Sequence, residues 1–131
     1  MTDKALIELA NKARESSYCP YSGFAVGAAL LCADGEVVLG CNIENSSYTP
    51  TVCAERVAIF SAVSKGKRDF VAIAISGGKA NGEPMAVCPP CGVCRQVLSE
   101  FCSPSMRIIF DDGSFTTLGE LLPLSFSLDK N

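Results

Sequence analysis

The beginning of the chain repeats apolar side chains with the period of an α-helix. Four of them fall at positions i, i+3, i+4 and i+7 of one helix face: Leu6, Leu9, Ala10 and Ala13. This spacing predicts an amphipathic helix over Asp3–Ser16, with Thr2 as its N-cap. The segment that follows, YCPYSG, contains a proline and a glycine and is predicted to be a loop.

The pattern then changes to runs that are typical of β-strands. Residues 24–33 and 36–43 are two apolar arms on either side of Asp34-Gly35, which predicts a β-hairpin. Phe70–Ser76 is a continuous apolar run of strand length, and MRIIFDD, which begins at Met106, is another. Such runs are typical of strands that are covered on both faces. Residues 77–84 (GGKANGEP) are predicted to be a surface loop.

Further helices are predicted between and after these strands. One begins with CAERVAIF at Cys53 and stops at Gly66, and the other, GVCRQVLSEFC, follows Pro89-Pro90. A capping box over residues 117–120 predicts a short last helix that ends at Pro123. Helices that alternate with buried strands predict an α/β fold with a mixed sheet between helical layers. Residues 1–131 are expected to form a single domain.

The composition excludes several classes of protein. Hydrophobic residues make up 48% of the chain and charged residues 19%, which is typical of a globular domain. The net charge of −3 and a pI near 4.9 argue against a nucleic-acid partner, which requires a basic surface. No apolar run is long enough for a membrane helix, and the charged N-terminal residues do not fit a secretion signal, so we expect a cytoplasmic protein. The mean hydropathy of +0.27 favours apolar surface covered by another subunit.

The chain contains eight cysteines and no histidine. Without histidine there is no Ser-His-Asp triad and no histidine-based zinc site. Any soft metal ion must therefore be bound by thiolates, and any proton transfer must use another titratable side chain. In a chain with no secretion signal, this many cysteines favours metal binding or catalysis over disulfides.

Three of the cysteines are placed to share one metal ion. Cys53 and Cys91 each open a predicted helix, and Cys94 lies on the same helix face as Cys91. A helix N-terminus stabilises negative charge, so thiolates are favoured at all three positions. Zn²⁺ takes four ligands, and three protein ligands leave one position for water, as in catalytic zinc sites. The residues by themselves also allow a structural zinc site, buried core cysteines or a redox pair, although the distant Cys53-x-Glu55 motif disfavours the last.

Charged residues stand directly beside these cysteines. Glu55 can approach the same ion as Cys53 only if the ion lies off the end of the helix, because residues i and i+2 do not share a helix face. A carboxylate next to a zinc-bound water is the arrangement that proton transfer in a hydrolysis requires. Three thiolates leave excess negative charge on Zn²⁺. We expect Arg56, in preference to Arg95, to donate hydrogen bonds to the ligand sulfurs and reduce that charge.

Together these motifs resemble those of the small homotetrameric cytidine deaminases. Cys53-Ala54-Glu55 and Pro90-Cys91-Gly92-Val93-Cys94 match the C-x-E and P-C-x-x-C signature of the zinc deaminases. The likeness extends over nearly the whole chain, through YSGFAVGAAL, NIENSSY, CAER, CRQVLSEF and ELLP. Cys88-Pro89 depart from the pattern, because family members more often have an apolar residue and Ser there. We expect Cys88 to stay out of the metal site, since the two prolines hold it outside the helix turn of Cys91 and Cys94.

The resemblance implies a fold and a reaction. The fold is a three-layer α/β/α arrangement with a mixed five-stranded sheet. The reaction is the hydrolytic deamination of cytidine and 2′-deoxycytidine to uridine and 2′-deoxyuridine in pyrimidine salvage, with one Zn²⁺ per chain on Cys53, Cys91 and Cys94 activating the water that attacks C4. The resemblance also implies that Glu55 takes a proton from this water, passes it to ring N3 and later helps ammonia leave.

The resemblance further implies contacts to the nucleoside. Asn42 and Glu44 match the ribose-binding pair of the family, and their i, i+2 spacing at a strand end places both on one side. Phe24 matches the aromatic residue that packs against the pyrimidine. Phe126 matches a phenylalanine that a neighbouring subunit of a homotetramer contributes. Two more residues on the substrate side are Tyr48, near the subunit contact, and Ala54.

Three other functions would use some of the same residues. A deaminase of blasticidin-type nucleoside antibiotics would share C-A-E and P-C-G-x-C-R-Q, but we would not expect the N-x-E block in it. Polynucleotide editing is opposed by the acidic pI and by the lack of basic and aromatic grooves. A nonenzymatic protein with a structural zinc would keep no water on the metal. In such a protein Glu55→Ala would change no measurable property other than stability.

Overall fold

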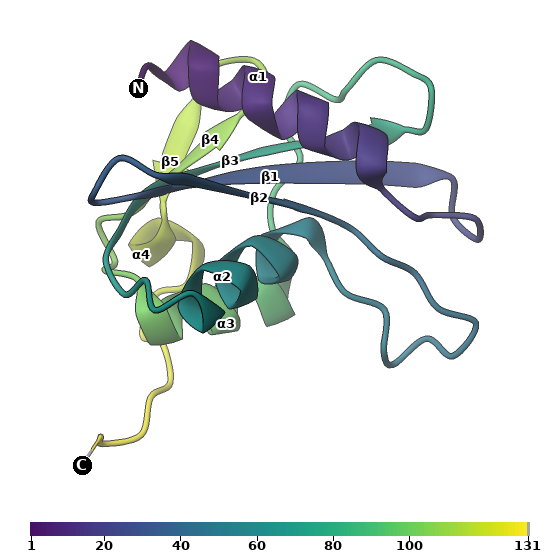
Figure 1. The fold of residues 1–131 in the computed structure, drawn as a ribbon. Helices are drawn as coiled ribbons and strands as arrows, with labels where there is room; N and C mark the ends of the chain where they lie inside the picture. The colour runs from purple at the N-terminus through teal and green to yellow at the C-terminus, as the bar shows by residue number, and fades with distance from the viewer. Residues whose placement is uncertain (131) are drawn as a thin grey trace.

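A mixed sheet of five strands forms the middle layer of the computed structural model, which describes residues 1–130 (Figure 1). The strands are β1 (Phe24–Cys32), β2 (Val37–Cys41), β3 (Phe70–Lys79), β4 (Arg107–Phe110) and β5 (Phe115–Thr117). They lie in the order β2-β1-β3-β4-β5, and only the β3–β4 pair is parallel. The predicted mixed sheet is confirmed.

Helices cover both faces of this sheet (Figure 1). One face carries α1 (Asp3–Ala13), and the other carries α2 (Ala54–Ser64), α3 (Gly92–Phe101) and the short α4 (Leu118–Leu121). Two separate apolar clusters fill the spaces between the layers. Coverage on both sides explains why β3 and β4 read as continuous apolar runs. Within residues 1–130, no helix has both the length and the apolar character needed to cross a membrane.

The two faces of the sheet differ in the size of their side chains. The face toward α2 and α3 carries large residues: Leu30, Ile73, Ile75, Ile108 and Phe110. The face toward α1 carries mostly alanines, among them Ala29, Ala72 and Ala74. Protein interiors are close-packed, so the side chains between the sheet and each helical layer must fill that space without large voids. The sheet therefore contributes larger side chains to the layer beneath α2 and α3 than to the layer beneath α1.

The helix ends follow the predicted signals. Thr2 caps α1 by accepting a hydrogen bond from the Ala5 N–H at 3.1 Å. The predicted extension to Ser16 forms a 3₁₀ turn, Arg14–Ser16, rather than α-helix. Helix α2 ends as predicted at Gly66, whose N–H bonds to the Val63 carbonyl at 3.0 Å. Thr117 caps α4, which ends before Pro123.

Two boundaries of the sheet differ from the sequence patterns. The predicted surface loop over residues 77–84 is wrong for Gly77–Lys79, which continue β3 and pair with Phe24–Val26 of β1. A Cβ at Gly77 would lie 2.5 Å from the Cys88 sulfur, so the glycine is required by a close approach and does not mark a turn. The apolar pattern also did not predict β5, which the family resemblance supplied, because three residues are too short to show a period.

Helix α2 packs against β2 at a glycine that the hairpin pattern does not mark. A Cβ at Gly40 would lie 2.4 Å from the Ala54 carbonyl oxygen and 2.6 Å from the Ala58 nitrogen. Both atoms belong to the helix backbone and cannot move away alone. Gly40 thus sets the height of the first turn of α2 above the sheet, and this is the turn that begins at Cys53.

We expect Gly40→Ala to lower the free energy of unfolding by about 1–3 kcal/mol, because the added methyl group must displace the α2 backbone. Gly92→Ala is the matched control, since a Cβ there meets nothing within 4 Å. The control should stay within about 0.5 kcal/mol of the wild type. Urea denaturation at fixed protein concentration measures both values. Equal losses in the two variants would contradict a backbone contact at Gly40.

Candidate active site

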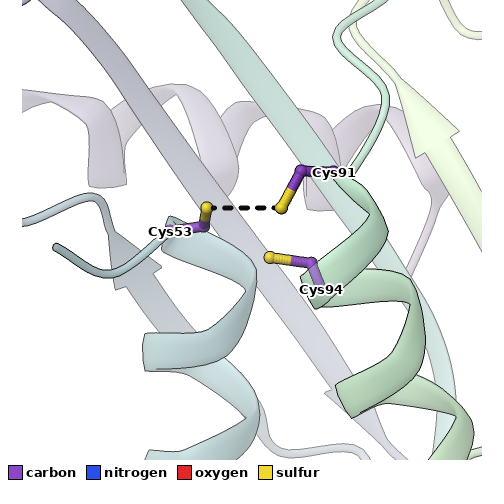
Figure 2. A group of neighbouring side chains, drawn as sticks. All are labelled: Cys53, Cys91 and Cys94. Atoms are coloured by element: carbon purple, nitrogen blue, oxygen red, sulfur yellow. Dashed lines mark hydrogen bonds between the residues drawn. The ribbon is translucent and has the colours of Figure 1, made fainter. Parts of the chain in front are cut away.

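Three cysteine sulfurs converge where the N-termini of α2 and α3 meet (Figure 2). The Sγ atoms of Cys53, Cys91 and Cys94 all lie within 4.8 Å of one another, and those of Cys53 and Cys91 are 3.7 Å apart. This separation is far too long for a disulfide, and all eight cysteines are free. The predicted convergence of these three residues is therefore confirmed.

The backbone explains why these sulfurs point away from the helices and toward each other. Cys53 and Cys91 are the N-caps of α2 and α3, both in extended conformation, and neither side chain makes a capping hydrogen bond. Their side chains remain free for another partner. Cys94 lies in the first turn of α3, beside Cys91 (Figure 2). The positive ends of two helix dipoles therefore face one cluster of thiols, which favours their ionised form.

The pKa values of Cys53 and Cys94 shift in opposite directions. A hydrogen bond with Cys94, followed by those from Arg56 and Cys91, lowers the pKa of Cys53 to about 5 despite its burial. The same interaction, together with burial, raises the pKa of Cys94. At neutral pH the cluster therefore already contains a thiolate, which is the form of cysteine that binds metal ions.

The donor set fits one zinc ion. Three sulfurs at tetrahedral positions about Zn²⁺, with Zn–S bonds of about 2.3 Å, lie about 3.8 Å apart. The 3.7 Å separation of the Cys53 and Cys91 sulfurs agrees with this value. Thiolate ligands select soft and borderline ions such as Zn²⁺. A fourth protein ligand is absent from the cluster within the described residues, so a bound ion would keep one position for a non-protein ligand.

Of the two arginines considered, Arg56 lies at the sulfurs. Its Nη2 donates to the Cys53 sulfur at 3.5 Å, whereas its Nε is buried with no hydrogen-bond partner in residues 1–130. Arg95 instead bonds two backbone carbonyls, those of Pro90 at 2.8 Å and Leu121 at 3.0 Å. It fixes the turn before α3 to the end of α4 and makes no sulfur contact of this kind. The preference for Arg56 agrees with this geometry.

Glu55 lies beneath the thiols, with only 4% of its surface exposed. Burial raises the pKa of its carboxyl to about 7, and the negative charge of Cys53 adds to the rise. A carboxyl with a pKa near neutrality can both accept and return a proton. Glu55, Cys53 and Cys91 line one wall of a cavity of about 340 Å³, so this proton-transfer group and the thiols share a space large enough for a small ligand.

The lining of this cavity includes three more of the predicted residues: Phe24, Asn42 and Glu44. They reach the thiols because residues 42–53 double back on themselves. Ile43 and Val52 exchange two backbone hydrogen bonds of 3.0 Å, so the chain leaves β2, makes the loop 44–51 and returns at once to Cys53. The i, i+2 spacing of Asn42 and Glu44 does place both side chains on one cavity.

Asn42 and Glu44 are held in place by hydrogen bonds. The Asn42 side chain donates to the Phe24 carbonyl at 2.8 Å and accepts from the Val26 N–H at 2.9 Å and the Ser17 hydroxyl at 2.5 Å. One amide N–H of Asn42 is left for another acceptor. Hydrogen bonds from the Ser22 hydroxyl and from nearby backbone N–H groups lower the pKa of the Glu44 carboxyl, so it is ionised at neutral pH and accepts only.

Three residues implied by the resemblance do not line this cavity. Tyr48 is 85% exposed on the loop 44–51, and Phe126 is 67% exposed on the segment after α4. Ala54 is fully buried between Cys53 and Glu55. Within one chain, the structure therefore brings Phe24, Asn42, Glu44 and Glu55 together with the thiols and leaves these three outside.

Six of the cavity residues had no predicted role in the site, and two of them, Ser22 and Cys88, carry a polar side chain next to the predicted residues. Ser22 lies at its mouth, inside the motif YSGF that carried the resemblance, but a serine in a polar loop has no signal of its own. Cys88 also lines the cavity and lies outside the metal cluster, as predicted. Burial raises the pKa of the Cys88 thiol, and the charge of Glu55 adds to the effect. Cys88 therefore presents a neutral thiol at neutral pH.

Comparison with known proteins agrees with this site. The family model "Cytidine and deoxycytidylate deaminase zinc-binding region" matches residues 1–110. A curated cytidine deaminase of Sporosarcina psychrophila is 49% identical over 131 residues, covering 97% of this chain and 93% of that protein. The crystal structure of cytidine deaminase from Burkholderia pseudomallei is 46% identical, with a TM-score of 0.88 over 96% of this chain and 100% of that one. A blasticidin-S deaminase of Bacillus cereus is 36% identical over 107 residues, covering 78% of this chain and 76% of that protein.

The three-layer α/β/α fold is thus shared with a cytidine deaminase of known structure. The chain belongs to the cytidine and deoxycytidylate deaminase zinc-binding family. Its Cys53, Cys91 and Cys94 form the cluster that can hold one zinc ion.

We expect the purified protein to contain one zinc per chain and Cys94→Ala to lose most of it, because two thiolates cannot replace three. Cys88→Ala is the matched control and should retain one zinc, since Cys88 lies outside the metal cluster. Metal analysis after exhaustive dialysis measures all three proteins. Zinc loss in Cys88→Ala would place Cys88 among the ligands and contradict the three-thiolate assignment.

Arg56→Gln should raise the dissociation constant for zinc by about 10- to 100-fold, the usual cost of removing a group that supports a metal ligand. The variant loses the positive charge of Arg56 and its hydrogen bond to the Cys53 sulfur, so the negative charge on the sulfurs is no longer reduced. Competition with a chromophoric chelator measures the constant. Arg68→Gln is a control of equal charge change at the other end of α2, where the guanidinium bonds the Val63 carbonyl at 2.9 Å. Unchanged zinc affinity and activity in Arg56→Gln would exclude this role.

Proposed function

We propose that residues 1–131 form one catalytic domain that deaminates cytidine and 2′-deoxycytidine to uridine and 2′-deoxyuridine, with release of ammonia. The observation that carries the proposal is the shared cavity, which joins the thiolate cluster and Glu55 to the pair Asn42 and Glu44. The names of the cytidine deaminases of similar sequence and structure support the choice of substrate.

The chemistry divides between the metal and the chain. When bound, zinc supplies a Lewis acid that makes water nucleophilic near neutral pH. Glu55 accepts the proton that this water releases, delivers it to ring N3 and then assists the departure of ammonia as the C4–N bond breaks. Its burial and its position beside Cys53 suit this exchange, because a carboxyl with a raised pKa returns a proton readily.

The remaining walls hold the nucleoside in our proposal. The ring of Phe24 packs against the pyrimidine. The free N–H of Asn42 donates to a sugar hydroxyl oxygen, and the ionised carboxylate of Glu44 accepts from a sugar hydroxyl. Ala54 is fully buried, so any contact that it makes with substrate comes through its backbone.

We further propose that the protein is a homotetramer in which neighbouring subunits complete each active site. Tyr48 and Phe126 are exposed aromatic residues that lie outside the cavity of their own chain. Exposed aromatic side chains are enriched where subunits meet. The positive mean hydropathy of a chain of this length supports the same assembly. A role in pyrimidine salvage in the cytoplasm completes the proposal.

The alternative is a deaminase of blasticidin-type nucleosides, which the relative from Bacillus cereus supports. The two functions differ in what the cavity must recognise. A carboxylate that lines the cavity and keeps one acceptor position on Oε2 suits a hydroxyl of an ordinary sugar. We therefore favour cytidine, and blasticidin S is the substrate to assay beside it.

We expect Glu55→Ala to lose cytidine deamination by at least about 100-fold, because the other carboxylate of this cavity, Glu44, has a lowered pKa and is held by hydrogen bonds. The variant should still bind one zinc, since Glu55 is not a ligand. The change in ultraviolet absorbance of cytidine follows the reaction, and metal analysis gives the zinc content. Glu100→Ala, which removes an exposed carboxylate near Lys130, is the control and should keep full activity.

Two results would redirect this proposal. A wild-type protein that holds one zinc but leaves cytidine and deoxycytidine unchanged overturns the substrate, and activity on blasticidin S would then support the alternative. A Glu55→Ala variant with full activity would show that another group transfers the proton.

A further inference from the structure

The hydroxyl of Ser22 joins two walls of the cavity. It lies in the loop that leads into β1, and it donates a hydrogen bond to Oε2 of Glu44. The hydroxyl oxygen of Ser22 in turn accepts a hydrogen bond from the N–H of Phe24 at 3.0 Å. One side chain therefore contacts both the carboxylate at the mouth of the cavity and the backbone of the aromatic residue in its wall.

The Glu44 carboxylate has few acceptor positions left. Its Oε1 accepts the backbone N–H groups of Tyr21 at 3.0 Å and Ser22 at 3.1 Å, which occupy both lone pairs of that oxygen. The Ser22 hydroxyl occupies one of the two on Oε2. A glutamate on a half-exposed loop usually samples several rotamers, and fixing it costs side-chain entropy. In this protein the hydrogen bonds fix the Glu44 side chain before a ligand binds, so binding does not have to remove that entropy.

The loop backbone does not depend on the Ser22 hydroxyl. The N–H of Tyr18 bonds the Asn42 carbonyl at 3.0 Å, and the N–H of Glu44 bonds the Tyr18 carbonyl at 2.8 Å. The N–H of Gly23 bonds the Cys19 carbonyl at 2.9 Å. These bonds hold residues 18–23 against residues 42–44 by main-chain atoms alone. Removing the hydroxyl should therefore free Oε2 of Glu44, while Oε1 keeps the N–H groups of Tyr21 and Ser22 and the loop stays folded.

We propose that Ser22 is a positioning residue for substrate binding, whose hydroxyl holds the Glu44 carboxylate in one orientation and fixes the start of β1 at Phe24. The inference rests on the proposed function, because it assumes that Glu44 accepts a hydroxyl of the nucleoside sugar. A preorganised acceptor binds more tightly than one that must be ordered by the ligand. The contacts of Ser22 go to Glu44 and Phe24 and to neither Glu55 nor the thiols, so its effect belongs to binding and not to the proton transfer.

The test compares the steady-state kinetics of five proteins with cytidine: the wild type, Ser22→Ala, Ser22→Thr, Glu44→Gln and the double variant Ser22→Ala/Glu44→Gln. Ser22→Ala should raise KM by about 3- to 10-fold, the range expected for one lost hydrogen bond, and leave kcat within about twofold. Ser22→Thr keeps a hydroxyl and should restore KM. Ser22→Ala should raise KM less in the Glu44→Gln background than in the wild type, because the part of its effect that acts through Glu44 is already lost there.

Ser114→Ala is the matched control for loss of a turn serine. Ser114 also donates its hydroxyl, at 2.6 Å, and its N–H, at 2.9 Å, to a carboxylate, that of Asp112, but it lies outside the cavity. Its KM should equal that of the wild type. The urea midpoints of Ser22→Ala and Ser114→Ala should agree, which shows that the first variant is folded.

The outcomes separate the two proposals. An unchanged KM in Ser22→Ala, a parallel loss of kcat and stability, or an equal KM rise in the Glu44→Gln background overturns the positioning role while the deamination by the wild type still supports the proposed function. A wild-type protein that does not deaminate cytidine overturns the proposed function and this inference with it.

Discussion

The meeting of two helix N-termini is the constraint on which the rest of this site depends. Helices α2 and α3 both begin at a cysteine, and they pack so that their first turns face one another. The positive ends of the two dipoles lower the cost of gathering thiolates at one point, and the guanidinium of Arg56 adds a third positive group there. Without this charge the three sulfurs would repel each other once ionised. The close approach of α2 to β2 at Gly40 keeps the arrangement at a fixed height above the sheet.

The second element of the site is a carboxylate that the fold keeps away from water. Glu55 follows Cys53 by two residues, so the first turn of α2 delivers both a metal ligand and a proton carrier. Burial raises the pKa of Glu55, whereas hydrogen bonds from Ser22 and nearby backbone N–H groups lower that of Glu44. Two glutamates on one cavity are therefore set to different tasks by their surroundings, one to exchange protons and one to accept hydrogen bonds.

Much of the fold could be predicted from the apolar pattern, because its signals are local. The 3.6-residue period of α1, the hairpin turn at Asp34-Gly35 and the apolar runs of β3 and β4 depend on neighbouring residues alone. The pattern failed where the cause is distant in sequence. Gly77 has the pattern of a loop residue, yet it extends β3 by pairing with Val26 of β1, and it is a glycine because Cys88 leaves no room for a side chain. The strand β5 is paired by β4 and has no period of its own.

The same division holds for the site. The residue types and spacings by themselves determined the set of groups available for chemistry: thiols at Cys53, Cys91 and Cys94, a carboxylate at Glu55 and no histidine. Only the tertiary structure decided which charged and polar groups meet them. It turned Arg56 to the sulfurs and Arg95 to backbone carbonyls, left Tyr48 and Phe126 outside their own cavity and placed Ser22 against Glu44. Spacing along a helix or strand predicts which side chains share a face, but contacts between segments far apart in the chain depend on how the layers pack.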